Sequence, residues 1–104
     1  MTADIDLLKR LQHWYGAHCD GSWEHRYGVS IDTLDNPGWS LVVDLTDTEL
    51  ADRVFDEVRV ERGGDGWYRC KVFDRVFEGS CGPMGLNELI GVFLNWADPS
   101  PPSE

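Results

Sequence analysis

The sequence lacks the features that mark several large classes of protein. Its 104 residues contain no apolar run close to the roughly 20 residues of a membrane-spanning helix. The first 12 residues carry two Asp before any basic residue and no apolar stretch, unlike a secretory signal peptide. Lys and Arg number nine against 19 Asp and Glu, and the net charge of −10 argues against binding to nucleic acid or anionic membranes. We therefore expect a cytoplasmic protein that binds neither.

Cysteine is scarce as well. Cys19, Cys70 and Cys81 are odd in number and lack paired spacing, which predicts free thiols in a reducing compartment rather than a disulfide framework. Apolar material is not scarce, because 41% of the residues are hydrophobic and five are Trp. A chain of this length and composition can close one core without disulfides or metal. We predict a single domain over residues 1–97 and a disordered, Pro-rich tail over residues 98–104.

Basic residues are absent from long parts of the chain. Residues 11–52 contain eight carboxylates against one Arg, a local net charge of −7, and no Lys or Arg follows Arg75. Residues 53–75 are different, with six basic and five acidic residues. The imbalance fits either an ordinary acidic surface or a negative face that meets a basic partner.

Two segments have the periodicity of amphipathic helices. Residues 5–15 place their apolar side chains on one broad face, with Thr2 or Asp4 as a possible cap and Gly16 as a possible end. Residues 86–97 repeat apolar side chains at the i, i+3, i+4, i+7 spacing of a helix that faces a core. The sequence therefore predicts a helix near each end of the domain.

Alternation of apolar and polar residues predicts the strands between these helices. The predicted strands cover residues 23–32, 39–45, 55–62, 67–73 and 76–78. Turn residues separate them: Asp35-Asn36-Pro37-Gly38 fits a type II turn with a positive φ at Gly38, residues 63–66 fit a hairpin connection, and residues 79–83 break regular structure. Residues 46–52 fit a loop or a single helical turn.

This order predicts an α+β fold. We expect an antiparallel four- to five-stranded meander with N- and C-terminal helices packed on one face, in two layers. The other face of the sheet would be solvated or used for binding. On the predicted alternation it carries Glu24, Arg26, Asp32, Asp44, Arg69 and Lys71.

A cluster of potential zinc ligands lies within 13 residues and consists of His13, His18, Cys19 and His25. The spacing matches neither a CxxC pair nor HExxH, and His13 is predicted on a helix whereas His25 is predicted on a strand. Surface and half-buried histidines explain the pattern better. We therefore predict no metal site and no other cofactor.

Catalytic motifs are missing too. Glu24 and His25 suggest an acid–base pair, but neighbouring residues of a strand point to opposite faces. The glycines of residues 79–83 lack the Lys of a phosphate-binding loop, and Cys81 would be reactive only if a helix dipole lowered its pKa. We predict that the protein is not an enzyme and has no catalytic residues.

Several rare sequence words occur together in this chain. They are Leu11-Gln12-x-Trp14-Tyr15, Cys19-Asp20-Gly21-x-Trp23-Glu24-His25-x-Tyr27-Gly28, Leu34-Asp35-Asn36-Pro37-Gly38-Trp39, the strand from Trp67 to Val72, Gly82-Pro83 and Phe93-Leu94-x-Trp96. Through them the chain resembles the immunity protein 53 family of bacterial polymorphic toxin systems. Cys81 stands where a small residue such as Gly is expected, and the Pro-rich tail is an individual addition.

The resemblance implies an intracellular α+β protein that binds and neutralises a toxin encoded beside it. It implies no catalytic residues and no particular toxin. The charge of the first half suggests a basic toxin such as a nuclease, with exposed aromatic residues as apolar anchors. The residues predicted to bind the toxin are Asp20, Trp23, Glu24, Tyr27, Asp32, Asp35, Trp39 and Asp44.

Two alternatives remain at this point. The stretch from Cys19 to Trp39, predicted to form the first hairpin, could instead belong to a small-ligand or metal-binding domain. A third possibility is an enzyme that reverses the modification made by a toxin.

Overall fold

The structure is a computed structural model that describes residues 6–61, 63 and 66–97. The predicted helix start at residue 5, its caps Thr2 and Asp4, the middle of the connection at residues 63–66 and the predicted tail lie outside these residues. The described elements are α1 (Leu7–His18), α2 (Trp23–Arg26), β1 (Val29–Leu34), β2 (Gly38–Asp44), β3 (Val58–Val60), β4 (Tyr68–Phe73), β5 (Val76–Cys81) and α3 (Leu86–Ala97).

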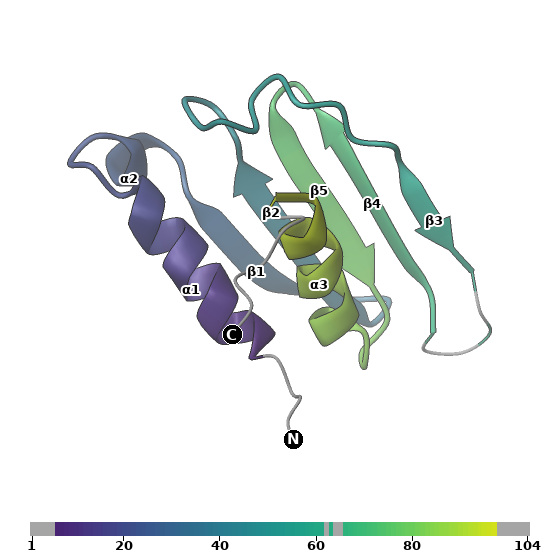
Figure 1. The fold of residues 1–104 in the computed structure, drawn as a ribbon. Helices are drawn as coiled ribbons and strands as arrows, with labels where there is room; N and C mark the ends of the chain where they lie inside the picture. The colour runs from purple at the N-terminus through teal and green to yellow at the C-terminus, as the bar shows by residue number, and fades with distance from the viewer. Residues whose placement is uncertain (1–5, 62, 64–65, 98–104) are drawn as a thin grey trace.

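The strands form one antiparallel sheet, and α1 and α3 lie side by side on one of its faces (Figure 1). The predicted two-layer α+β fold with N- and C-terminal helices is confirmed. The sheet has the order β1-β2-β5-β4-β3, so β1 and β3 are its two edges. In the described part of the chain, no helix has the length and apolar character needed to cross a membrane.

The strand order departs from the predicted meander at one point, because β2 pairs with β5 and not with β3. The connection between β2 and β3 passes along one end of the sheet to its far edge (Figure 1). Leu45 and Leu50 anchor this connection in the core, where both are fully buried. It is also fastened to the end of α3, since Arg53 Nη1 donates to the Trp96 carbonyl at 3.0 Å. Burial that depends on residues distant in the sequence cannot be predicted from a local pattern.

The core between helices and sheet is rich in aromatic rings. Phe93 of α3 lies 5.1 Å, centroid to centroid, from Trp14 of α1 and 5.1 Å from Phe77 of β5, in edge-to-face geometry. Phe77 in turn contacts Phe55 of the β2–β3 connection at 5.5 Å. Edge-to-face pairs of this kind add about 0.5–1.5 kcal/mol each to the gain from burial. The aromatic cluster therefore joins both helices, the sheet and the long connection into one core.

The helices begin and end where local capping permits. Asp6 caps α1 by accepting from the backbone N–H of Lys9 at 3.1 Å. The predicted end at Gly16 is wrong, because α1 continues to His18, whose Nδ1 lies 2.8 Å from the Trp14 carbonyl. The helix predicted at residues 86–97 has the predicted bounds.

Two glycines in the sheet are required by close packing. At Gly38 an added Cβ would collide with the carbonyl of Cys81, and the positive φ predicted there is wrong. At Gly79 an added Cβ would lie 2.7 Å from Leu89 Cδ1. The prediction that residues 79–83 break regular structure is wrong for residues 79–81, because β5 continues to Cys81 and Gly79 lets it run beneath α3.

Candidate functional site

The segment predicted to begin the first strand starts instead with a helical turn, α2. Asp20 Oδ1 accepts from the backbone N–H groups of Ser22 at 2.9 Å and Trp23 at 3.0 Å. The Glu24 side chain in turn accepts from the backbone N–H groups of two preceding residues, Asp20 at 2.9 Å and Gly21 at 2.8 Å. This reciprocal arrangement resembles a capping box and satisfies the free N–H groups at the start of the turn.

These hydrogen bonds lower the pKa of both carboxylates. The backbone N–H of Trp23, followed by that of Ser22, lowers the pKa of Asp20 below its ordinary value of 3.8. For Glu24 the backbone N–H groups of Glu24 itself, Asp20 and Gly21 lower the pKa below 4.5. Both side chains are therefore anionic and hold the local fold, whether or not they also meet a partner. Because α2 is a helical turn, the strand argument that separated Glu24 from His25 does not apply.

The two aromatic residues predicted beside these carboxylates differ in exposure. Trp23 is only 3% exposed, and its Nε1 donates to the Thr46 carbonyl at 3.0 Å. Its ring packs in the core and has almost no surface left for contact with a partner. Tyr27 caps the end of α2, is half-buried and packs against the core. Of the pair, Tyr27 is the one that reaches the surface.

The uncovered face of the sheet brings some of the predicted residues together. Tyr27 and Asp44 line one shallow hollow of about 340 Å³, together with Gly28, Ser30 and Val42. Asp32 pairs with Ser40 in the β1–β2 ladder, which places both on this same face. Asp44 also orders the chain after β2, since its Oδ1 accepts from the Thr46 N–H at 3.0 Å.

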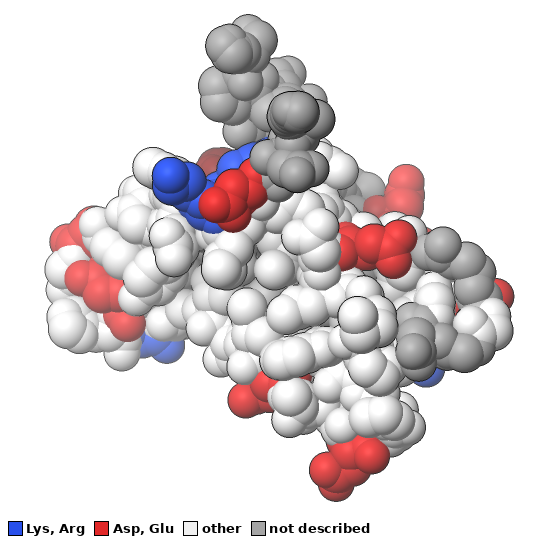
Figure 2. Space-filling model, turned by 90° about the horizontal axis from the view of Figure 1, so that it is seen from below, with Lys and Arg blue, Asp and Glu red and all other residues white. Residues whose placement is uncertain are grey.

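Two further predicted residues lie at the other end of the β1–β2 hairpin. Asp35 is exposed in the turn, whose Asn36–Pro37 peptide bond is cis. Trp39 is half-buried and donates from Nε1 to the Pro83 carbonyl at 2.9 Å, which fastens β2 to the chain leading into α3. Figure 2 views this end of the molecule and shows a broad uncharged surface with scattered acidic groups and few basic ones.

The exposed and half-buried carboxylates of this side form what we call the acidic β1 surface. It comprises Asp20, Glu24, Asp32, Asp35 and Asp44. They extend from α2 along β1 and β2 to the hairpin turn and do not converge on one point. The arrangement suits a broad contact area better than a catalytic centre.

His18 has a structural role that the sequence did not reveal. Its Nδ1 faces the Trp14 carbonyl and its Nε2 faces Glu49 Oε1, each at 2.8 Å. A carbonyl and a carboxylate both accept, so each ring nitrogen must carry a proton for both contacts to be hydrogen bonds. The ring also lies 4.2 Å, centroid to centroid, from Trp14. Partial burial raises the pKa of Glu49, but hydrogen bonds from His18 and the backbone outweigh it and lower that pKa overall.

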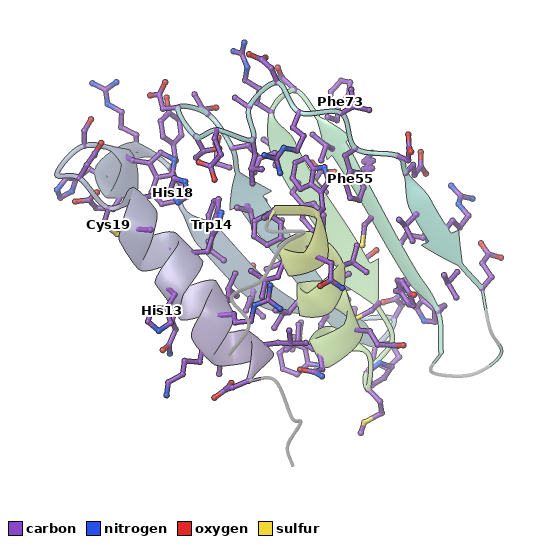
Figure 3. All side chains as sticks on the ribbon, in the orientation of Figure 1. His13, Trp14, His18, Cys19, Phe55 and Phe73 are labelled. Atoms are coloured by element: carbon purple, nitrogen blue, oxygen red, sulfur yellow. The ribbon has the colours of Figure 1, made fainter. Side chains whose placement is uncertain are left out.

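The potential zinc ligands do not come together. In Figure 3, His13 projects from α1 away from His18, and Cys19 lies at the end of the helix. Across the described residues, no group of three or more His, Cys, Asp or Glu side chains is arranged to hold a metal ion.

The cysteines are free, as predicted. Burial, with the neighbouring Cys81, raises the pKa of Cys70 to about 12. Burial also raises the pKa of Cys81, so the thiol at the entry to α3 is not activated.

The opposite side of the uncovered face carries the basic residues. A hollow of about 390 Å³ lies over β3, β4, β5 and β2 and is lined by Arg59, Arg69 and Lys71 among others. Two of these cations face carboxylates: Arg59 lies 3.4 Å from Glu57 and Lys71 lies 3.7 Å from Glu78. Arg69 lies over the Trp67 ring at 5.4 Å from its centroid. This side is nearly balanced in charge, unlike the acidic β1 surface.

Comparison with known proteins gives one match. The sequence model of the family described as immunity protein 53 matches residues 8–98, which is most of the chain. No curated protein and no solved structure matches it significantly. The match begins at the second residue of α1 and covers every later element through α3. The chain therefore belongs to the immunity protein 53 family, whose name indicates a toxin-neutralising role.

Proposed function

We propose that this protein neutralises a cognate bacterial toxin by binding and occluding it one for one, without catalysis, in the cytoplasm. The family supports the neutralising role. The observation that carries the binding mechanism is the acidic β1 surface, which has no Lys or Arg in the strands beneath it. We propose that this surface meets the toxin, and that the toxin is basic there, as the substrate cleft of a nuclease would be.

The carboxylates of the acidic β1 surface can attract a basic toxin because of the groups to which they are hydrogen-bonded. Asp20, Glu24 and Asp44 accept from backbone N–H groups, and among the described residues none of the three forms an ion pair with Lys, Arg or His. Within the described residues, Asp32 and Asp35 have no ion-pair partner at all. Uncompensated charge of one sign raises the association rate with an oppositely charged surface and makes that rate depend on salt.

Apolar contact would complete the binding. Tyr27 lines the hollow on the uncovered face, and Trp39 is half-buried near the hairpin end. Trp23 would support this surface from beneath, since it is buried. Interfaces commonly draw most of their affinity from a few such aromatic residues.

Titration of toxin activity tests the proposal. The toxin encoded beside this chain is assayed with increasing amounts of the purified protein, and calorimetry gives the stoichiometry. We expect inhibition to end at one equivalent and the association rate to fall steeply as salt is added. Full protection at far less than one equivalent would instead indicate an enzyme that reverses the toxin's modification. Absence of binding would refute the proposal.

Elemental analysis covers the remaining alternative. Protein purified without added metal should contain no stoichiometric zinc. Zinc that is lost on substituting His25 and Cys19 would favour a metal-binding domain.

A further inference from the structure

One edge of the sheet presents hydrogen-bonding groups that the chain itself does not use. β1 is an edge strand of six residues. Asp44 N donates to the Gly28 carbonyl at 3.0 Å, and in an antiparallel ladder bonded pairs alternate with non-bonded ones. The bonded pairs along β1 are therefore Ser30 with Val42, Asp32 with Ser40 and Leu34 with Gly38. It follows that the N–H and C=O groups of Val29, Ile31 and Thr33 point out of the sheet.

Helix α1 lies over the space next to this edge. It packs chiefly against α3 and makes little contact with any strand, so one flank of it projects alongside β1 (Figure 1). That flank is apolar and exposed, with Leu8 at 53% and Tyr15 at 38%. A groove of about 310 Å³ separates α1 from β1 and is lined by Leu11, Tyr15, Tyr27 and Val29, with Gln12 and Gly28.

The side chains of β1 continue this apolar strip. Ile31 pairs with the buried Leu41 and so points to the helix side, yet it is 36% exposed. A neighbouring strand would cover Ile31 from the side, and α1 would cover that strand from above. The helix layer thus extends past the β1 edge of the sheet by about the width of one strand.

We infer that an extended segment of the toxin adds to β1 as a sixth strand and fills the groove beneath α1. This inference rests on the proposed function and specifies how the partner docks. Main-chain hydrogen bonds to Val29, Ile31 and Thr33 would supply affinity, as in other cases of strand addition. The alternation of a strand sets the chemistry of the segment.

The segment should alternate apolar and basic residues. Side chains beside Val29 and Ile31 would point into the apolar groove under Leu8 and Tyr15. Side chains beside Asp32 would point to the uncovered face, where Asp44 also lies. Carboxylates without a cationic partner there favour Lys or Arg in the added strand.

A second copy of this chain fits the edge poorly. Antiparallel pairing of two β1 strands would bring the Asp32 side chains of both copies onto the same face. Each copy also carries a net charge of −10, which opposes self-association. The basic partner is the occupant that this charge favours.

Amide hydrogen exchange of the full chain, free and with a catalytically inactive form of the adjacent toxin, tests the inference. The Val29, Ile31 and Thr33 amides should slow by at least about 10-fold in the complex. The Ser30 and Asp32 amides, already bonded to β2, should change much less. A complex that forms without this alternating protection would overturn the inference and leave the proposed function standing. Absence of any complex would overturn both.

Two variants of Ile31 distinguish the contribution of its backbone N–H to toxin binding from that of its side chain. Ile31→Pro removes an outward N–H without removing a bond to β2, and should weaken toxin binding by at least about 100-fold. Ile31→Thr keeps the N–H and should bind within about 10-fold of the unchanged protein. Equal binding by both variants would contradict strand addition, as would a free protein that is already a dimer with protected β1 amides. If Ile31→Pro does not fold, the exchange experiment decides.

Discussion

The two edges of the sheet differ in length, charge and surroundings. β3 has three residues, and its Arg59 faces Glu57 at 3.4 Å. β1 has six residues and no Lys or Arg, and an apolar groove runs between it and α1. Natural sheets protect their edges by keeping them short or charged. β3 fits that rule by its length, whereas β1 is twice as long and carries one charged residue, Asp32. We infer from this difference that β1 is the edge available for a partner.

Charge divides the molecule along the same line. On the β3 side, Arg59 and Lys71 each lie within 4 Å of a carboxylate, at 3.4 and 3.7 Å. On the β1 side, carboxylates accept from backbone N–H groups or, in the described structure, have no ion-pair partner. Compensated charges produce little field at a distance, whereas uncompensated ones steer a partner. The β1 side should therefore dominate both encounter and docking.

The largest expected effect is on the free energy of unfolding, when a core side chain beneath the acidic β1 surface is removed. Trp23→Ala should lower the free energy of unfolding by about 3–5 kcal/mol, because a fully buried ring and the hydrogen bond to Thr46 are lost. On the other side, Trp67→Ala should cost about 1 kcal/mol, because that ring is only partly buried beneath Arg69. Urea unfolding measures both. Similar losses would show that the two sides are supported alike.

The next effect concerns charge on the two edges. Asp32→Lys with Asp35→Lys should slow association with the toxin by about 10-fold at low salt. Asp56→Lys with Glu61→Lys changes the net charge by the same amount beside β3 and should change the rate less than about 3-fold. Stopped-flow mixing gives both rates. Equal slowing would mean that only the net charge matters, and the distinction between the edges would fail.

A smaller effect is expected from the exposed flank of α1. Leu8→Ser should weaken toxin binding by about 5-fold, since part of one apolar side chain is no longer buried on binding. Met84→Ser is the matched control, because Met84 is also an exposed apolar residue but lies before α3, away from the groove. Calorimetry of both variants compares the sites. A larger loss of toxin affinity for Met84→Ser than for Leu8→Ser would indicate that the interface lies at the turn end of the β1–β2 hairpin.

The smallest effect is a dependence of stability on pH. The pKa values of Asp20 and Glu24 are lowered in the folded chain, below 3.8 and 4.5. The unfolded chain therefore binds more protons in this range, and the contribution is present above about pH 4.5 and is lost as the pH falls through the folded pKa values. Asp20→Asn with Glu24→Gln should flatten the fall in the urea midpoint between about pH 5 and 3. An unchanged slope would show that these hydrogen bonds contribute nothing.

Much of the fold could be predicted because its signals are local. α3 has the predicted bounds, since one continuous apolar stripe follows Gly82 and Pro83. β2 and β4 lie within one residue of their predicted ranges, where alternation persists across the strand. The error at α2 arose because apolar residues alternate through a single helical turn. The side chains that cap it, Asp20 and Glu24, are a local signal that could have identified it.

The candidate site was less accessible from the sequence. The acidic half could be recognised from its composition, and the predicted meander already places the first strand at an edge. That β3 rather than β5 forms the other edge depends on the pairing of β2 with β5. The role of His18 depends on Glu49, 31 residues away. The burial of Trp23 depends on the cluster with Trp14 and on α2. Each of these is a long-range arrangement that no local pattern encodes.

The most direct test is a nuclear magnetic resonance titration of the labelled chain with the inactive toxin. We expect amide signals of residues 29–34 to shift, with saturation at one equivalent, and those of Val58–Val60 to stay in place. Shifts centred on β3, or continuing well beyond one equivalent, would contradict a one-for-one complex at the β1 edge.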